Sequence, residues 1–246
     1  MKSFLLNYNN YSISLFSLYH ILLMSLTFLI LLIVIINKKK FKNFKPKTKK
    51  IIKYTFGVIL IINLIIRRCS FIYFNVYDWQ KHLDINFCNF VNLLTIIYIF
   101  SGNKKVLEKT YYMSFVGPLL AVILPSYNLQ PLTYSFISFI LTHHILLIFN
   151  FIFIFMDDLI YDKYMINRVL RFLIIYFVII YTFDYSFDVN YNMPLTFINT
   201  TLLNNPLINI IASNVILTYI AYVLVINLLL IIGDFALKYI TKQELN

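Results

Sequence analysis

Seven apolar segments, most of them about 20 residues long, alternate with short polar clusters along this chain of 246 residues. A helix needs about 20 mainly apolar residues to cross the hydrocarbon core of a bilayer. The chain is 61% hydrophobic and 13% charged, whereas about a quarter of a soluble domain is charged. No alternating period-two segments suggest a β-barrel. We therefore predict an all-α, polytopic helix bundle, a single transmembrane domain over residues 1–246, in the cell membrane.

The spans are predicted from apolar runs bounded by charges. The fourth is short and contains Gly117 and Pro118, so we expect it to be bent or incomplete. The predicted spans are Ile13–Ile36, Ile51–Phe74, Leu83–Ser101, Thr110–Pro125, Leu132–Met156, Met165–Phe183 and Leu207–Ile232.

A lysine cluster between the first two spans predicts which way the spans cross the membrane. Positive loops stay on the cytoplasmic side, so we predict the N-terminus outside and the C-terminus inside. In a soluble protein such a cluster would suggest nucleic acid, but between two spans it indicates contact with anionic lipid headgroups. No nucleic acid partner is predicted. The cluster consists of Lys38, Lys39, Lys40, Lys42, Lys45, Lys47, Lys49 and Lys50.

The third predicted span carries polar groups on one side. At about 100° per residue, Asn86, Cys88, Asn89 and Asn92 fall within about half of the circumference. Polar side chains are costly in lipid, so this face should look into the bundle. The amides could bind a substrate or simply join helices by hydrogen bonds.

The fifth predicted span, "TYSFISFILTHHILLIFN", contains adjacent histidines. Helical geometry favours His143 as the interior one and turns His144 to nearly the opposite side. A cysteine and a histidine on facing helices can form an activated nucleophile, because the imidazole takes the thiol proton and the thiolate attacks an acyl carbonyl. A histidine held structurally by a neighbouring helix is the alternative.

The remaining polar groups are an arginine, the two cysteines and an acidic segment. Arg67, near the outer end of the second span, suits a phospholipid phosphate if it does not extend to the interface. Cys69 and Cys88 could form one disulfide, but two free thiols are expected. "DDLIYD", from Asp157 to Asp162, is interpreted as a solvated helix boundary. No glycine-rich phosphate loop or metal-ligand spacing occurs, and no cofactor or metal is predicted.

Several short motifs resemble those of the YwaF-like bacterial integral membrane proteins, which are related to the eukaryotic transmembrane protein 164. These motifs are "WQKHLDINFCN", "YYMSFVGPLLAVILPSY", "FISFILTHH" and "VNYNMPL". The resemblance covers about Asn63 to Pro206 and aligns His143, rather than His144, with the family histidine. Asp84 and Asn86 stand where the family has proline and histidine, and Asn86 could replace only the hydrogen bonding of that histidine.

The resemblance implies acyl transfer between phospholipids, with Cys88 as the acyl-accepting nucleophile and His143 as its base. Asn86, Asn89, Asn92, Arg67, Asn190 and Tyr191 are the predicted substrate-binding residues, and membrane lipids are the predicted partners. The alternatives are a small-solute transporter or its substrate-binding subunit, and a non-enzymatic membrane protein. The oligomeric state is left open.

Overall fold

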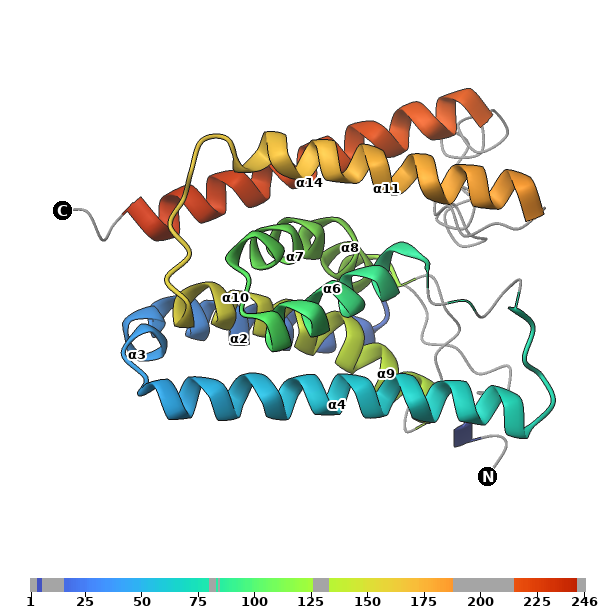
Figure 1. Cartoon of the computed structure of the whole chain (residues 1–246), viewed down its shortest axis with the longest axis horizontal. Coiled ribbons are helices and arrows are strands. Elements are labelled where there is room, and N and C mark those ends of the chain that lie inside the picture. The colour runs from blue at the N-terminus through green and yellow to red at the C-terminus, as the bar shows by residue number, and fades with distance from the viewer. Residues whose placement is uncertain are drawn as a thin grey trace. The chain divides into compact units, whose positions relative to one another are not determined.

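A computed structural model describes residues 4–5, 16–79, 83, 85–125, 133–187 and 215–242. Its elements are helical, with no strand in these ranges (Figure 1). The helices are α2 (Leu18–Ile36), α3 (Lys38–Lys42), α4 (Pro46–Tyr73), α6 (Phe87–Ser101), α7 (Lys104–Val116), α8 (Pro118–Ile123), α9 (Tyr134–Phe139), the π-helical turn η1 (Ile140–Ile145), α10 (Leu146–Met156), α11 (Met165–Phe187) and α14 (Val215–Lys242).

The helical membrane class agrees with the prediction. Within the described ranges, five helices are long and apolar enough to cross a membrane: α2, α4, the continuous helix Tyr134–Met156, α11 and Val223–Thr241. α6 is apolar but shorter. The count of seven spans and the orientation of the termini stay predictions. The organisation of the chain as a single domain also stays a prediction.

The fourth predicted span is divided where its sequence suggested. α7 ends at Val116 and α8 begins at Pro118, which occupies the first helical position. Proline has no N–H to donate to the preceding turn and its ring clashes with a continuing helix. α7 also begins earlier than predicted, at Lys104, and buries Glu108.

The helix made of α9, η1 and α10 forms the core of its part of the molecule. In this helix 78% of the most apolar window is buried, against 22–33% in the other four candidate spans. Phe149 stacks on Phe56 of α4 with ring centroids 4.0 Å apart, and Phe151 meets Tyr111 of α7 edge to face. The central helix is therefore surrounded by protein.

The chain divides into two compact units. One comprises Met1–Asp78 and Cys88–Ile160, and the other comprises Trp79–Phe87 and Tyr161–Asn246. In the second unit α11 contacts α14. Asp162 precedes α11, and its carboxylate accepts a hydrogen bond from the backbone N–H of Tyr164 and a 2.6 Å bond from Arg168. The bond from Arg168 lowers the pKa of Asp162 below its ordinary value.

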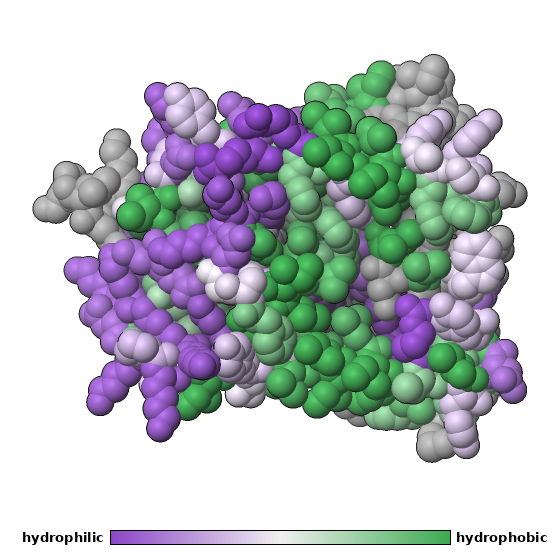
Figure 2. Space-filling view, in the orientation of Figure 1, coloured by the Kyte–Doolittle hydropathy of each residue, from purple (hydrophilic) through white to green (hydrophobic). Residues whose placement is uncertain are grey.

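Charged side chains gather at one end of the first unit. Figure 2 shows hydrophilic surface over the region where α3 lies and mainly hydrophobic surface beside it. Lys39, Lys40, Lys45, Lys47 and Lys50 are exposed there. This distribution fits a bundle whose apolar sides face lipid and whose lysine-rich end faces water and headgroups.

Candidate functional site

The candidate site depends on the pairing of α4 with α6. The two helices run antiparallel, because Arg67 contacts Asn89 at one end and Lys53 lies over the ring of Tyr98 at the other. Gly57 allows the close approach between them: a Cβ atom there would lie 2.9 Å from Cγ2 of Ile99. The absence of a side chain at one position therefore sets how near the polar groups of the two helices come.

At one end of this pair a polar network joins three helices. Nη1 of Arg67 donates to Oδ1 of Asn89 at 3.2 Å. Tyr134 of α9 donates its hydroxyl to both the backbone oxygen and Oδ1 of Asn63, at 2.6 and 2.8 Å. Asn63 and Arg67 are four residues apart on α4, so they lie on the same face.

The polar side of α6 is buried. Cys88, Asn92 and Thr95 recur at the i, i+4, i+7 spacing of one helical face, and Asn89 lies beside them; all four are buried. Among the described residues neither amide atom of Asn92 has a hydrogen-bond partner. Asn86 precedes the helix and is half-buried. Phe87 and Val91 of α6 are buried too, and Leu93, Ile97 and Phe100 are its exposed apolar side chains.

Both histidines of the central helix are buried, which corrects the expectation that only His143 is interior. Because the helix is surrounded, the side that turns away from His143 also meets protein: Nδ1 of His144 lies 2.7 Å from Oγ1 of Thr27 in α2. Both histidines belong to η1, a wider turn that frequently marks functional sites. Nδ1 of His143 lies 3.0 Å from the backbone oxygen of Phe139 and from Oγ1 of Thr142.

The predicted catalytic pair is not hydrogen-bonded in this structure. Among the residues that are described, the thiol of Cys88 has no hydrogen-bond partner and is a free cysteine, as is Cys69. Arg67 bonds to Asn89, which follows Cys88 on α6. Asn190 and Tyr191 lie outside the described residues.

Sequence reasoning missed the polar contacts of α2 and α9. His20 and Thr27 are seven residues apart, so they share a face of α2; both are buried, and Nε2 of His20 lies 3.0 Å from the backbone oxygen of Val122. This spacing was visible in the sequence. The bond from Tyr134 to Asn63 was not, because nothing in either segment indicates that α9 meets α4.

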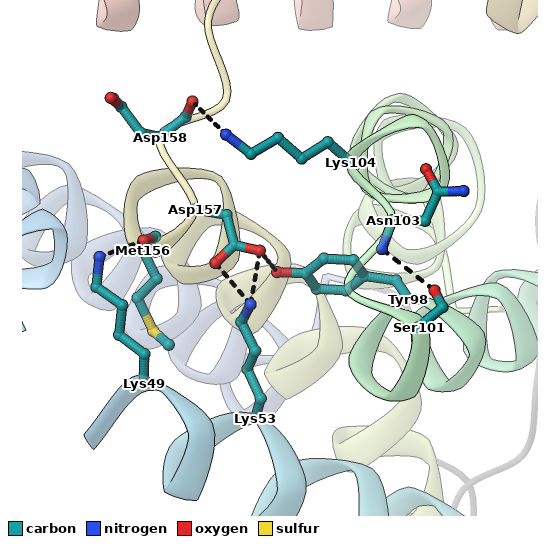
Figure 3. A network of polar contacts seen from close by, with 9 residues as sticks. All are labelled: Lys49, Lys53, Tyr98, Ser101, Asn103, Lys104, Met156, Asp157 and Asp158. Carbon is teal, nitrogen blue, oxygen red and sulfur yellow. Dashed lines mark hydrogen bonds and ion pairs between the residues drawn. The ribbon is translucent and has the colours of Figure 1, made fainter. Parts of the chain in front are cut away.

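A second polar network lies at the other end of the α4–α6 pair (Figure 3). Nζ of Lys53 lies 2.6 Å from each carboxylate oxygen of Asp157, and Tyr98 donates its hydroxyl to the same carboxylate at 2.6 Å. Its neighbour Asp158 forms a more exposed ion pair with Lys42 at 2.9 Å. The interpretation of Asp157 as part of a solvated helix boundary was therefore wrong, since its side chain is only 15% exposed.

The described residues contain no group of three or more His, Cys, Asp or Glu side chains that could hold a metal ion. Besides the two networks, the first unit holds a buried thiol and a buried imidazole, so a thiol, an imidazole, a guanidinium group and several amides occur in one helical membrane unit. These are groups for nucleophilic chemistry or for binding a polar headgroup.

Comparison with known proteins gives the family. A family model described as "TMEM164 family" matches residues 15–238, nearly the whole chain. No curated protein and no solved structure matches the chain. The relationship to transmembrane protein 164 that the short motifs predicted is confirmed. The chain belongs to the TMEM164 family, and with five helices in its described part that are long and apolar enough to cross a membrane it is an integral membrane protein.

Proposed function

We propose that this protein transfers fatty acyl chains between membrane phospholipids through a thioester on Cys88, with His143 as the general base. Membership of the family and the burial of a free thiol among polar side chains support this function. The observation that carries it is the state of the His143 ring, because its hydrogen bonds decide whether the imidazole can accept a proton.

The contacts of His143 favour one neutral tautomer. A backbone oxygen only accepts hydrogen bonds, so Nδ1, 3.0 Å from the oxygen of Phe139, is the nitrogen that carries the proton. Thr142 does not compete, since its hydroxyl donates to the backbone oxygen of Ser138 at 2.8 Å. Nε2 then has the lone pair and can act as a base.

Cys88 is buried, and because burial opposes ionisation its thiolate would need positive charge nearby. It is the second residue of α6, and the unpaired backbone N–H groups of a first helical turn stabilise an anion. The guanidinium group of Arg67, bonded to the adjacent Asn89, adds positive charge nearby. Catalytic hydrogen bonds are often long before substrate binds and tighten in the complex, and the thiol of Cys88 would approach Nε2 of His143 in that step.

The reaction would proceed in two halves. Nε2 takes the proton of the thiol, the sulfur attacks the carbonyl carbon of a phospholipid ester, and the departing lysophospholipid oxygen takes the proton from the imidazolium. The hydroxyl of a second lysophospholipid then gives its proton to Nε2 and attacks the thioester; the acyl–sulfur bond breaks, and the departing sulfur of Cys88 takes the proton back from the imidazolium. Arg67 offers a guanidinium group for the substrate phosphate. The residues Asn86, Asn89, Asn92, Asn190 and Tyr191 are proposed to bind the rest of the polar headgroup and ester.

The test is to trap the acyl-enzyme. A Cys69→Ser variant, in which Cys88 is the only thiol, is placed in nanodiscs of phosphatidylcholine with isotope-labelled acyl chains and analysed by intact mass spectrometry. We expect a labelled adduct that neutral hydroxylamine removes and that a lysophospholipid acceptor discharges. His143→Gln should slow its formation by about 10²–10⁴, and Cys88→Ala should abolish it. An unmodified Cys88 in every lipid mixture would contradict the proposal.

A further inference from the structure

Asn92 is a buried amide without a partner inside the protein. Its side chain is 1% exposed, and in the described part of the chain neither Nδ2 nor Oδ1 makes a hydrogen bond. A buried polar group in that state costs free energy, and such groups in folded proteins call for an explanation. The explanation should be something that binds there.

The neighbouring helix presents a second unpaired donor at the same level. From Arg67 to Asn63 is about one turn along α4, and from Asn89 to Asn92 is about one turn along α6. Because the helices are antiparallel and Arg67 contacts Asn89, both steps lead in the same direction. Nδ2 of Asn63 also lacks a partner among the described residues, while its Oδ1 lies 2.8 Å from the hydroxyl of Tyr134.

Cys88 lies about one helical turn before Asn92 on α6. The two residues are separated by four positions, and side chains at that spacing on a helix are neighbours. Thr95, three residues further on the same face, is different, because its hydroxyl is already bonded to the backbone oxygen of Val91 at 2.9 Å. The unsatisfied donor therefore stands next to the thiol.

We propose that Nδ2 of Asn92 donates a hydrogen bond to the carbonyl oxygen of the ester that Cys88 attacks, with Nδ2 of Asn63 facing the same space. This inference rests on the proposed function. As the sulfur–carbon bond forms, the π electrons of the carbonyl move to its oxygen, and Asn92 stabilises the resulting oxyanion. When the intermediate collapses, the carbonyl forms again, the ester oxygen leaves with the proton held by His143, and the acyl group remains on Cys88. Donors placed where negative charge develops are a major source of rate enhancement.

The experiment compares Asn92→Leu with Thr95→Val, both in the Cys69→Ser background. Leucine keeps the number of side-chain heavy atoms of asparagine and removes the donor, and valine removes a hydroxyl that is already satisfied. For each variant three quantities are measured: the rate at which labelled phosphatidylcholine acylates Cys88, the rate at which N-ethylmaleimide alkylates it, and the melting temperature.

We expect Asn92→Leu to slow acylation by about 10²–10³, to leave alkylation within about twofold and not to lower the melting temperature, since the amide it removes has no partner. Thr95→Val should acylate at the rate of the parent protein. Acylation of Asn92→Leu at the parent rate, an equal loss in both reactions, or a failure to fold would overturn the inference while leaving the proposed function in place. A parent protein that forms no adduct would instead refute the proposed function.

Discussion

Asp157 and Asp158 are adjacent carboxylates that each pair with a lysine, and their different burial predicts very different costs of neutralisation. The pair of Asp157 with Lys53 has side chains that are 15% and 14% exposed, whereas Asp158 and Lys42 are 47% and 37% exposed. Asp157→Asn leaves the Lys53 ammonium mostly buried without a counter-charge. Breaking a buried pair costs about 3–5 kcal/mol, and the residual exposure places this case near 3 kcal/mol. An exposed pair contributes about 0–1 kcal/mol.

For a chain of this length about 1 kcal/mol shifts the melting temperature by about 2–4 °C. Asp157→Asn should therefore lower it by about 6–12 °C, and Asp158→Asn by less than about 4 °C. The assay is thermal unfolding in detergent in the Cys69→Ser background, followed with a thiol-reactive fluorophore that reports exposure of the buried Cys88. Lys53→Met added to Asp157→Asn should recover part of the loss, because the unpaired charge is removed. Equal shifts for the two single variants would refute this reasoning.

Two further predictions concern helix packing and the carboxylate of Asp162. Gly57→Ala should lower the stability by about 1–3 kcal/mol, because its Cβ would lie 2.9 Å from Cγ2 of Ile99. In the double variant with Ile99→Ala, the loss of stability should be smaller than the sum of the two single losses. Strict additivity in thermal unfolding would contradict this prediction. Asp162 has a lowered pKa through its bond from Arg168, so its contribution to stability is present at neutral pH and lost as the pH falls through its folded pKa. The difference in melting temperature between Asp162→Asn and the parent should therefore vanish at acid pH, and a difference independent of pH would exclude the charge as its cause.

The sequence predicts the class of this fold because lipid imposes one rule on every span. Apolar length alone locates α2, α4 and α11, and the Gly117–Pro118 pair locates the break between α7 and α8, since proline restricts the backbone locally. α6 begins at Phe87, later than predicted, because hydropathy marks where a segment becomes apolar and not where its first helical turn forms.

The polar interior was harder to predict, because it depends on which helices are neighbours. A single helical projection assumes lipid on one side, and the central helix has protein around it, so both His143 and His144 are interior. The π-helical turn leaves no pattern in the residues that form it. Asp157 resembles a helix-end charge in the sequence, and only the approach of Lys53 and Tyr98 from two other helices makes it part of a buried network.

The most direct test of the central claim asks whether Cys88 and position 143 reach one another. In the Cys69→Ser background, His143→Cys introduces a second thiol, and dibromobimane, which becomes fluorescent when it joins two nearby thiols, is added to native membranes. Ile137→Cys, an exposed position on the same helix, is the control. We expect a fluorescent cross-link for His143→Cys and none for Ile137→Cys. Two thiols that are each alkylated but never joined in His143→Cys would contradict it.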